Sequence, residues 1–183
     1  MEKDYFENVI VFSAKEIMKD LMERLEGEEY IHPACFFFVN TGSTPKQVVI
    51  EPLHPDRANW VHQMKYLKSN IENEGQVEAC LVLHEGRGIQ VDPNNAADQY
   101  FIIQEYYKKY GTLEGCPIEP KDVLTGWLMA PTCQYAAMIS SEISIDRNFK
   151  KLKVDVLDTN DCKGTLVDEF NEVFKSDYPV GEA

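Results

Sequence analysis

The first apolar pattern along the chain predicts a helix. From residue 14 to residue 25, apolar side chains recur every three or four positions, which places them on one face of an α-helix. Ser13 and Glu16 have the spacing of a capping box, and Gly27 is the residue type that most often follows a helix end. We therefore predict a helix that begins at Ser13 and ends before Gly27. Its core stripe is Ala14, Ile17, Met18, Leu21, Met22 and Leu25.

Short apolar runs rich in aromatic and β-branched residues predict the strands. Two of them, 34–39 and 47–50, flank a segment with Gly and Pro, which favours a hairpin. A third run, 77–83, leads into Gly-Arg-Gly at 86–88, which is typical of a tight turn. Three more strands are predicted at 123–130, 135–145 and 152–157.

Three later segments have helical patterns. The first extends from residue 55 or 56 to residue 74, with its apolar stripe at Trp60, Met64, Leu67 and Ile71. The second opens at Asp92-Pro93 and stops at Gly111, although 100–103 is apolar on every side, so a buried strand there stays open. The third covers 165–175, and its stripe is Leu166, Phe170, Val173 and Phe174.

The order of these elements predicts the fold class. Sequential strands joined by short connections favour an antiparallel sheet with helices packed on it. We predict a single α+β domain over 1–183, with a mostly antiparallel or mixed sheet, three to four helices, and a loose tail at 177–183. The predicted core includes Ile17, Leu21, Leu25, Trp60, Met64, Leu67, Leu81, Leu83, Phe170 and Phe174.

Charge excludes some classes of partner. Eighteen Lys and Arg against thirty-one Asp and Glu leave a net charge of −13. Nucleic acids and anionic membrane surfaces are bound by basic surface, so we expect neither as a partner. Acidic surface is compatible with a basic protein partner, and it also serves solubility alone.

The sequence also indicates the compartment. The apolar run at 9–12 is too short for a signal peptide, and no later run approaches the roughly 20 residues of a membrane span. Five cysteines form an odd count with no CxxC pair, which does not suggest a disulfide framework. We expect five free thiols and a cytoplasmic protein.

The histidines suggest two places for chemistry. His54 and Asp56 are good metal ligands, but a helix-capping Asp beside surface histidines explains the same residues. At the end of the strand 77–83, His84 has the chemistry of a base, Glu85 of its orienting carboxylate, and Arg87 of an anion clamp. A glycine turn with a solvated imidazole is the structural alternative at this second place.

A tyrosine-rich face is the third candidate. If the segment before Gly111 is helical, Tyr100, Tyr107 and Tyr110 share one face together with Ile103. Tyrosine anchors protein interfaces because its ring gives a large contact area and its hydroxyl forms hydrogen bonds. The edge of an ordinary core is the alternative explanation.

Two functional hypotheses follow. The first is a non-enzymatic binding or regulatory module that acts on a protein partner or on a second copy of itself. The second is a small metal-assisted hydrolase around His84 and Glu85, with help from His54. No cofactor is expected, because no nucleotide, metal or nucleophile motif of known spacing is present. We prefer the binding module, since the polar groups complete no catalytic arrangement in the sequence.

Overall fold

A computed structural model describes residues 1–42, 47–88, 95–118, 120–131, 135–157 and 165–174. The predicted tail at 177–183 and the predicted helix start at Asp92-Pro93 lie outside these residues. Within them, helix and strand alternate in the predicted order, and the segment before Gly111 is helix. No helix in this part of the chain is long and apolar enough to cross a membrane.

The fold is α+β, with one antiparallel sheet of six strands in the order β2-β1-β3-β4-β5-β6. The strands are β1 (Ala34–Asn40), β2 (Gln47–Pro52), β3 (Gln76–Gly88), β4 (Lys121–Met129), β5 (Ala136–Glu142) and β6 (Lys153–Leu157). β1 and β2 form the predicted hairpin, and β3 then joins the other side of β1. Every pairing is antiparallel, so the mixed alternative does not apply to the described strands.

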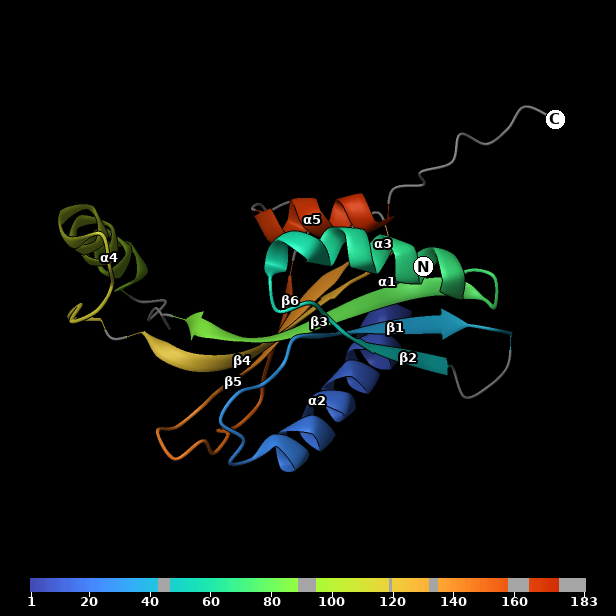
Figure 1. Cartoon of the computed structure of the whole chain (residues 1–183), viewed down its shortest axis with the longest axis horizontal. Coiled ribbons are helices and arrows are strands. Elements are labelled where there is room, and N and C mark those ends of the chain that lie inside the picture. The colour runs from blue at the N-terminus through green and yellow to red at the C-terminus, as the bar shows by residue number, and fades with distance from the viewer. Residues whose placement is uncertain (43–46, 89–94, 119, 132–134, 158–164, 175–183) are drawn as a thin grey trace.

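The sheet separates two apolar cores, because successive side chains of a strand point to opposite faces. Helix α2 (Phe12–Leu25) covers one face, and α3 (Trp60–Ile71) and α5 (Thr165–Phe174) cover the other (Figure 1). In β1, Phe36 and Phe38 pack on the α2 side, whereas Phe37 packs on the side of α3 and α5. Each strand of the centre is therefore apolar on both faces, which explains its continuous apolar run.

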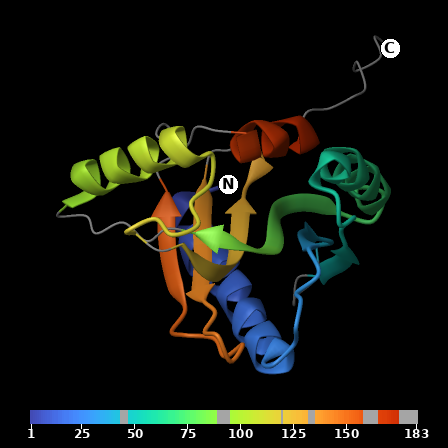
Figure 2. The ribbon, with the colours of Figure 1, turned by 60° about the vertical axis from the view of Figure 1, so that its left-hand side comes forward.

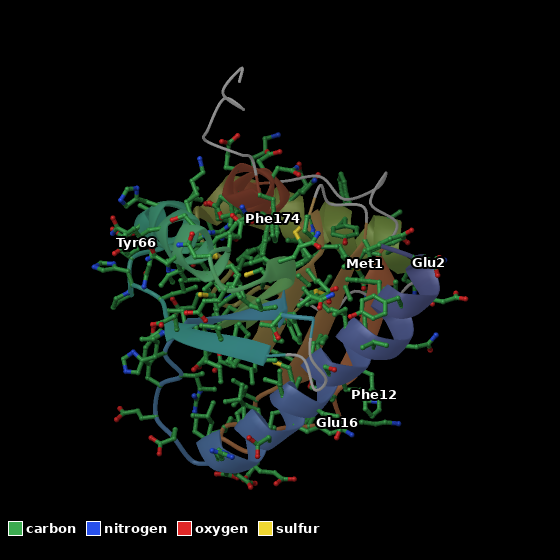
Figure 3. All side chains as sticks on the ribbon, turned by 90° about the vertical axis from the view of Figure 1, so that its right-hand side faces the viewer. Met1, Glu2, Phe12, Glu16, Tyr66 and Phe174 are labelled. Atoms are coloured by element: carbon green, nitrogen blue, oxygen red, sulfur yellow. The ribbon has the colours of Figure 1, made fainter. Side chains whose placement is uncertain are left out.

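The N-terminal helix starts earlier than predicted. α1 (Lys3–Tyr5), the π-helical η1 (Phe6–Val11) and α2 follow one another without a break. The Ser13 hydroxyl does not cap a helix, because it donates to the carbonyl of Val9 one turn before it, at 2.7 Å. The extra turns let Phe6 and Ile10 join the core, while Phe12 projects away from the sheet (Figure 3).

This shift changes which residues of the helix are buried. Ala14 and Met18 are fully buried, but Ile17, Leu21 and Leu25, which we expected in the core, are only partly buried at its edge. Elsewhere the predicted core is mostly confirmed, since Trp60, Met64, Leu81, Leu83 and Phe170 are buried. Leu67 and Phe174 are partly buried against the same cluster.

The Gly-Arg-Gly segment is strand and not turn. β3 extends through Gly88, and Gly86 and Arg87 pair with Val123 and Asp122 of β4. Arg87 is exposed and lies 3.4 Å from the Asp122 carboxylate, so its visible partner is this neighbouring strand. The glycine turn that we predicted here is therefore wrong.

Helix α4 (Ala96–Tyr110) stands apart from the layered body. It lies near the end of β3 and the start of β4, clear of the sheet in both views (Figures 1 and 2). Its end at Gly111 is as predicted, since Gly111 is left-handed with φ 69° and its N–H donates to the Tyr107 carbonyl. No residue of α4 is buried.

Candidate functional site

Asp56 caps the short 3-10 helix η2 (Arg57–Asn59) that leads into α3, and His54 contacts this cap. The Asp56 carboxylate accepts the N–H of Ala58 at 3.0 Å, and the Asp56 N–H donates to Nδ1 of His54 at 2.9 Å. A backbone N–H can only donate, so Nδ1 of His54 accepts this hydrogen bond. The structural explanation of this motif is confirmed by these contacts. His62 lies farther along α3 and is exposed.

His84 lies at the same corner of the molecule. Its ring is 5.9 Å from the Trp60 ring, and the Trp60 indole N–H donates to the His54 carbonyl at 2.6 Å. Burial lowers the pKa of His84, and the nearby Arg57 guanidinium lowers it further. The imidazole is therefore less solvated than the structural alternative assumes. His84 is a half-buried side chain whose lowered pKa favours the neutral imidazole at pH 7.

Glu85 points to the opposite face of the sheet. Its two carboxylate oxygens accept hydrogen bonds from Nη1 and Nη2 of Arg147, at 2.6 and 2.8 Å, and one also accepts the Ile31 N–H at 3.2 Å. These hydrogen bonds hold the pKa of Glu85 below its usual 4.5. The Glu85 carboxylate therefore does not lie beside the His84 ring. It links the end of β3 to the two segments that carry Ile31 and Arg147.

A row of polar side chains does accompany His84. On the face covered by α3 and α5, His84 pairs with Thr125, Thr125 with Ser140, and Ser140 with Lys153 across four strands. His84, Thr125 and Ser140 are half-buried, and no hydrogen bond of the two hydroxyls is seen within the described residues. The row lies beside the apolar core under α3 and α5. We call it the polar row.

The polar row could not be found from the sequence, since its members come from strands far apart in the chain. Its hydroxyls and neutral imidazole can exchange hydrogen bonds with a polar ligand, and the half-buried Trp127 offers a ring nearby. Among the described residues, no three His, Cys, Asp or Glu side chains gather closely enough to hold a metal ion. Trp60 contacts both histidines: its indole N–H donates to the His54 carbonyl, and its ring lies beside the His84 ring.

The tyrosine face is the third predicted site, and the structure leaves it accessible. Tyr100, Tyr107 and Tyr110 are each more than half exposed. Phe101 and Ile102, at 65% and 40% exposed, add apolar surface on the other side of the helix. An ordinary surface helix hides its apolar stripe against the core, and α4 does not.

Two contacts on the inner side of α4 are made by Tyr106, one of them with the segment that follows the helix. The Tyr106 hydroxyl donates to the Glu114 carbonyl at 2.8 Å, and Tyr106 and Tyr110 lie with ring centroids 4.5 Å apart. A shallow hollow between this segment and the charged side of the helix is lined by Pro117, by Tyr106 and Tyr110, and by Phe101, Ile102, Glu105, Lys108 and Lys109. These contacts leave Tyr100 and Tyr107 more than half exposed.

Comparisons with known proteins add no relative. No family model matches the chain, and neither a curated protein nor a solved structure is similar to it. The fold and the geometry of these three places are therefore the basis for a function.

Proposed function

We propose that the protein is a non-enzymatic binding module that engages a protein partner through α4. The observation that carries this proposal is the exposure of the helix. Over its fifteen residues α4 has none that is buried, and Tyr100, Phe101, Ile102, Tyr107 and Tyr110 are 40% to 65% exposed.

The energetics favour a covered helix. Burying a large apolar side chain is worth about 1.5 to 3 kcal/mol, so this much exposed apolar surface leaves a substantial gain unused in the free protein. Contiguous exposed apolar surface is typical of interaction sites, and tyrosine is enriched among the residues that dominate binding energy. A protein partner that covers α4 would recover this free energy.

The metal-assisted hydrolase remains the alternative, and the described contacts favour it less. Such an enzyme would use His84 without Glu85, because the carboxylate is on the other face and is saturated by Arg147 and Ile31. No carboxylate of the polar row accompanies Thr125 or Ser140, and the ammonium form of Lys153 donates hydrogen bonds but accepts none. The polar row is more suited to hold a ligand than to activate water.

A site-specific photo-crosslinker tests the proposal. The crosslinking amino acid is placed at Tyr107 in α4 and, as a matched control, at Tyr66, which is 65% exposed on α3. Figure 3 shows Tyr66 on the outer side of the body. A protein captured at Tyr107 and not at Tyr66 is identified, purified and titrated against the wild type.

The titration then includes two variants. We expect Tyr100→Ser/Tyr107→Ser to weaken binding at least about tenfold, because interface tyrosines commonly contribute more than 1 kcal/mol each. Tyr66→Ser should leave the affinity unchanged. An unchanged affinity in the α4 variant, or equal capture at both positions, would refute α4 as the docking element.

A further inference from the structure

The charges of α4 are divided along its length. Asp98 and Glu105 are its only acidic residues, and Lys108 and Lys109 in the last turn are its only basic ones. The helix is therefore neutral, although the chain as a whole carries −13. Over this part of the surface a highly acidic molecule presents no net negative charge.

These charges lie on the outer face of the helix. Positions 98, 101, 102, 105, 108 and 109 recur at intervals of three and four, so they form one stripe, and all six residues are exposed. The half-buried residues of α4 form a different stripe: Ala96, Gln99, Ile103 and Tyr106. The outer stripe thus begins with Asp98, carries Phe101 and Ile102 in its first half, and ends with Lys108 and Lys109, of which Lys108 lies 3.8 Å from the Glu105 carboxylate.

We propose that the partner of α4 is a second copy of this chain, which docks its own α4 antiparallel on this outer stripe. A two-fold axis near the middle of the helix brings Asp98 of each copy opposite Lys109 of the other, and Phe101 and Ile102 of both copies meet between these pairs. This inference rests on the proposed function, because it names a partner of the same helix, on the stripe that lies across the helix from Tyr100 and Tyr107.

Three physical terms favour the antiparallel arrangement. A two-fold contact uses the same patch twice, so a stripe with opposite charges at its two ends is complementary to itself. Antiparallel helices also place opposite ends of their macrodipoles side by side. Two copies of a chain with net charge −13 repel each other, and a contact through the neutral α4 adds no like charges at the contact itself.

The size of the helix fixes the strength of the contact. Fifteen residues at 1.5 Å each give a helix only about 22 Å long. Two helices of this length bury much less surface area than the interface of a permanent dimer does. We therefore expect a reversible dimer with a dissociation constant on the order of 10 to 100 µM. Dilute protein should be monomeric.

Sedimentation velocity over a concentration series tests this inference. The wild type is compared with two charge-reversed variants, Asp98→Lys/Glu105→Lys and Lys108→Glu/Lys109→Glu, after circular dichroism has shown that both are folded. Each variant alone should associate at least about tenfold more weakly, because its outer stripe carries charge of one sign. The equimolar mixture should restore association to the wild-type level.

The acid-to-lysine variant separates a specific contact from general repulsion. This variant lowers the net negative charge of the chain, so general repulsion alone would make it associate more readily than the wild type. The docked arrangement requires the opposite. Stronger association of this variant alone would therefore overturn the inference.

Other outcomes overturn it as well. A wild type that stays monomeric throughout the series, variants that dimerise like the wild type, or a mixture that fails to restore association each contradict the second copy as the occupant. If Tyr100→Ser/Tyr107→Ser still weakens a partner captured at Tyr107, the proposed function stands and only self-docking falls. If neither experiment shows an effect of α4, both fall.

Discussion

Arg147 and Glu85 form a two-pronged ion pair between segments that lie 62 residues apart in the chain. Both terminal nitrogens of the guanidinium donate to the carboxylate, and Nε donates to the Glu28 carbonyl at 2.8 Å. Arg147 adopts a left-handed backbone with φ 61°, the only such non-glycine residue among those described. The ion pair thus fastens the turn between β5 and β6 to the end of β3 and to the segment after α2.

Removing the charge of Glu85 should destabilise the fold. We expect Glu85→Gln to lower the free energy of unfolding by about 1 to 3 kcal/mol at pH 7, because a two-pronged, charge-assisted pair with little exposure is lost. Urea denaturation measures the change. Glu23→Gln, at an exposed position of α2, is the control and should stay within about 0.5 kcal/mol of the wild type.

The same variant has a predictable dependence on pH. Since the folded protein holds the pKa of Glu85 below 4.5, the ion pair stabilises the fold above that pH, and its contribution is lost as pH falls through the lower folded value. The difference between wild type and Glu85→Gln should therefore shrink below about pH 4. A difference that stays constant from pH 7 to pH 3 would contradict the ion pair.

The left-handed backbone of Arg147 gives a second prediction. Arg147→Ala and Arg147→Gly both lose the side chain, but only alanine keeps a Cβ that is unfavourable at φ 61°. We expect both to destabilise the fold, with glycine the more stable of the two by up to about 1 kcal/mol. Thermal denaturation of the two variants measures this difference in stability. An alanine variant at least as stable as the glycine variant would show that the backbone at residue 147 is not strained.

Gly126 makes close contact between β4 and α2. A Cβ built there would lie 2.9 Å from Cδ1 of Leu81 and 3.1 Å from Sδ of Met18, so the ends of these two buried side chains would have to shift. We expect Gly126→Ala to cost about 1 to 3 kcal/mol of stability through overpacking. Gly86→Ala is the control, because its nearest neighbour would be Nδ1 of His84 at 3.5 Å, an ordinary contact. Equal stabilities of the two variants would contradict this packing.

His84 should titrate below its usual range. Burial disfavours the imidazolium, so nuclear magnetic resonance should find a pKa below 6.5. A lowered folded pKa means that the unfolded chain binds the proton more readily, so the fold loses stability as pH falls below about 6.5. His84→Gln should remove that part of the pH dependence. A His84 pKa at or above 6.5 would show that the ring is solvated.

The sequence predicted most of the fold because the signals for it are local. Alternation and apolar runs identified all six strands, and the stripe of Trp60 and Met64 identified a buried helix face. The capping pattern at Ser13 misplaced the helix start, since a hydroxyl inside a helix can bond back to a carbonyl one turn earlier. We interpreted Gly86 as part of a turn, but glycine also occurs within strands, and here it pairs with Val123 of β4.

The sites were harder to predict because they depend on distant pairing. Alternation alone already places His84 and Glu85 on opposite faces of a continued strand, and extending the predicted strand by two residues would have separated them. The polar row and the partner of Glu85 depend on the registers of β4, β5 and β6, for which the sequence carries no local signal. Periodicity predicted the tyrosine face, but only the fold shows that α4 lies off the sheet.

The central claim is that α4 leaves Tyr100 and Tyr107 uncovered in the free molecule. The most direct measurement is the relaxation that a soluble paramagnetic agent causes in the aromatic resonances of dilute protein, where no second copy can dock. We expect the rings of Tyr100 and Tyr107 to relax as fast as that of Tyr66, since all three are more than half exposed. Rings of Tyr100 and Tyr107 protected to the level of the half-buried Trp127 would show that α4 folds onto the body of the molecule, and would contradict the account.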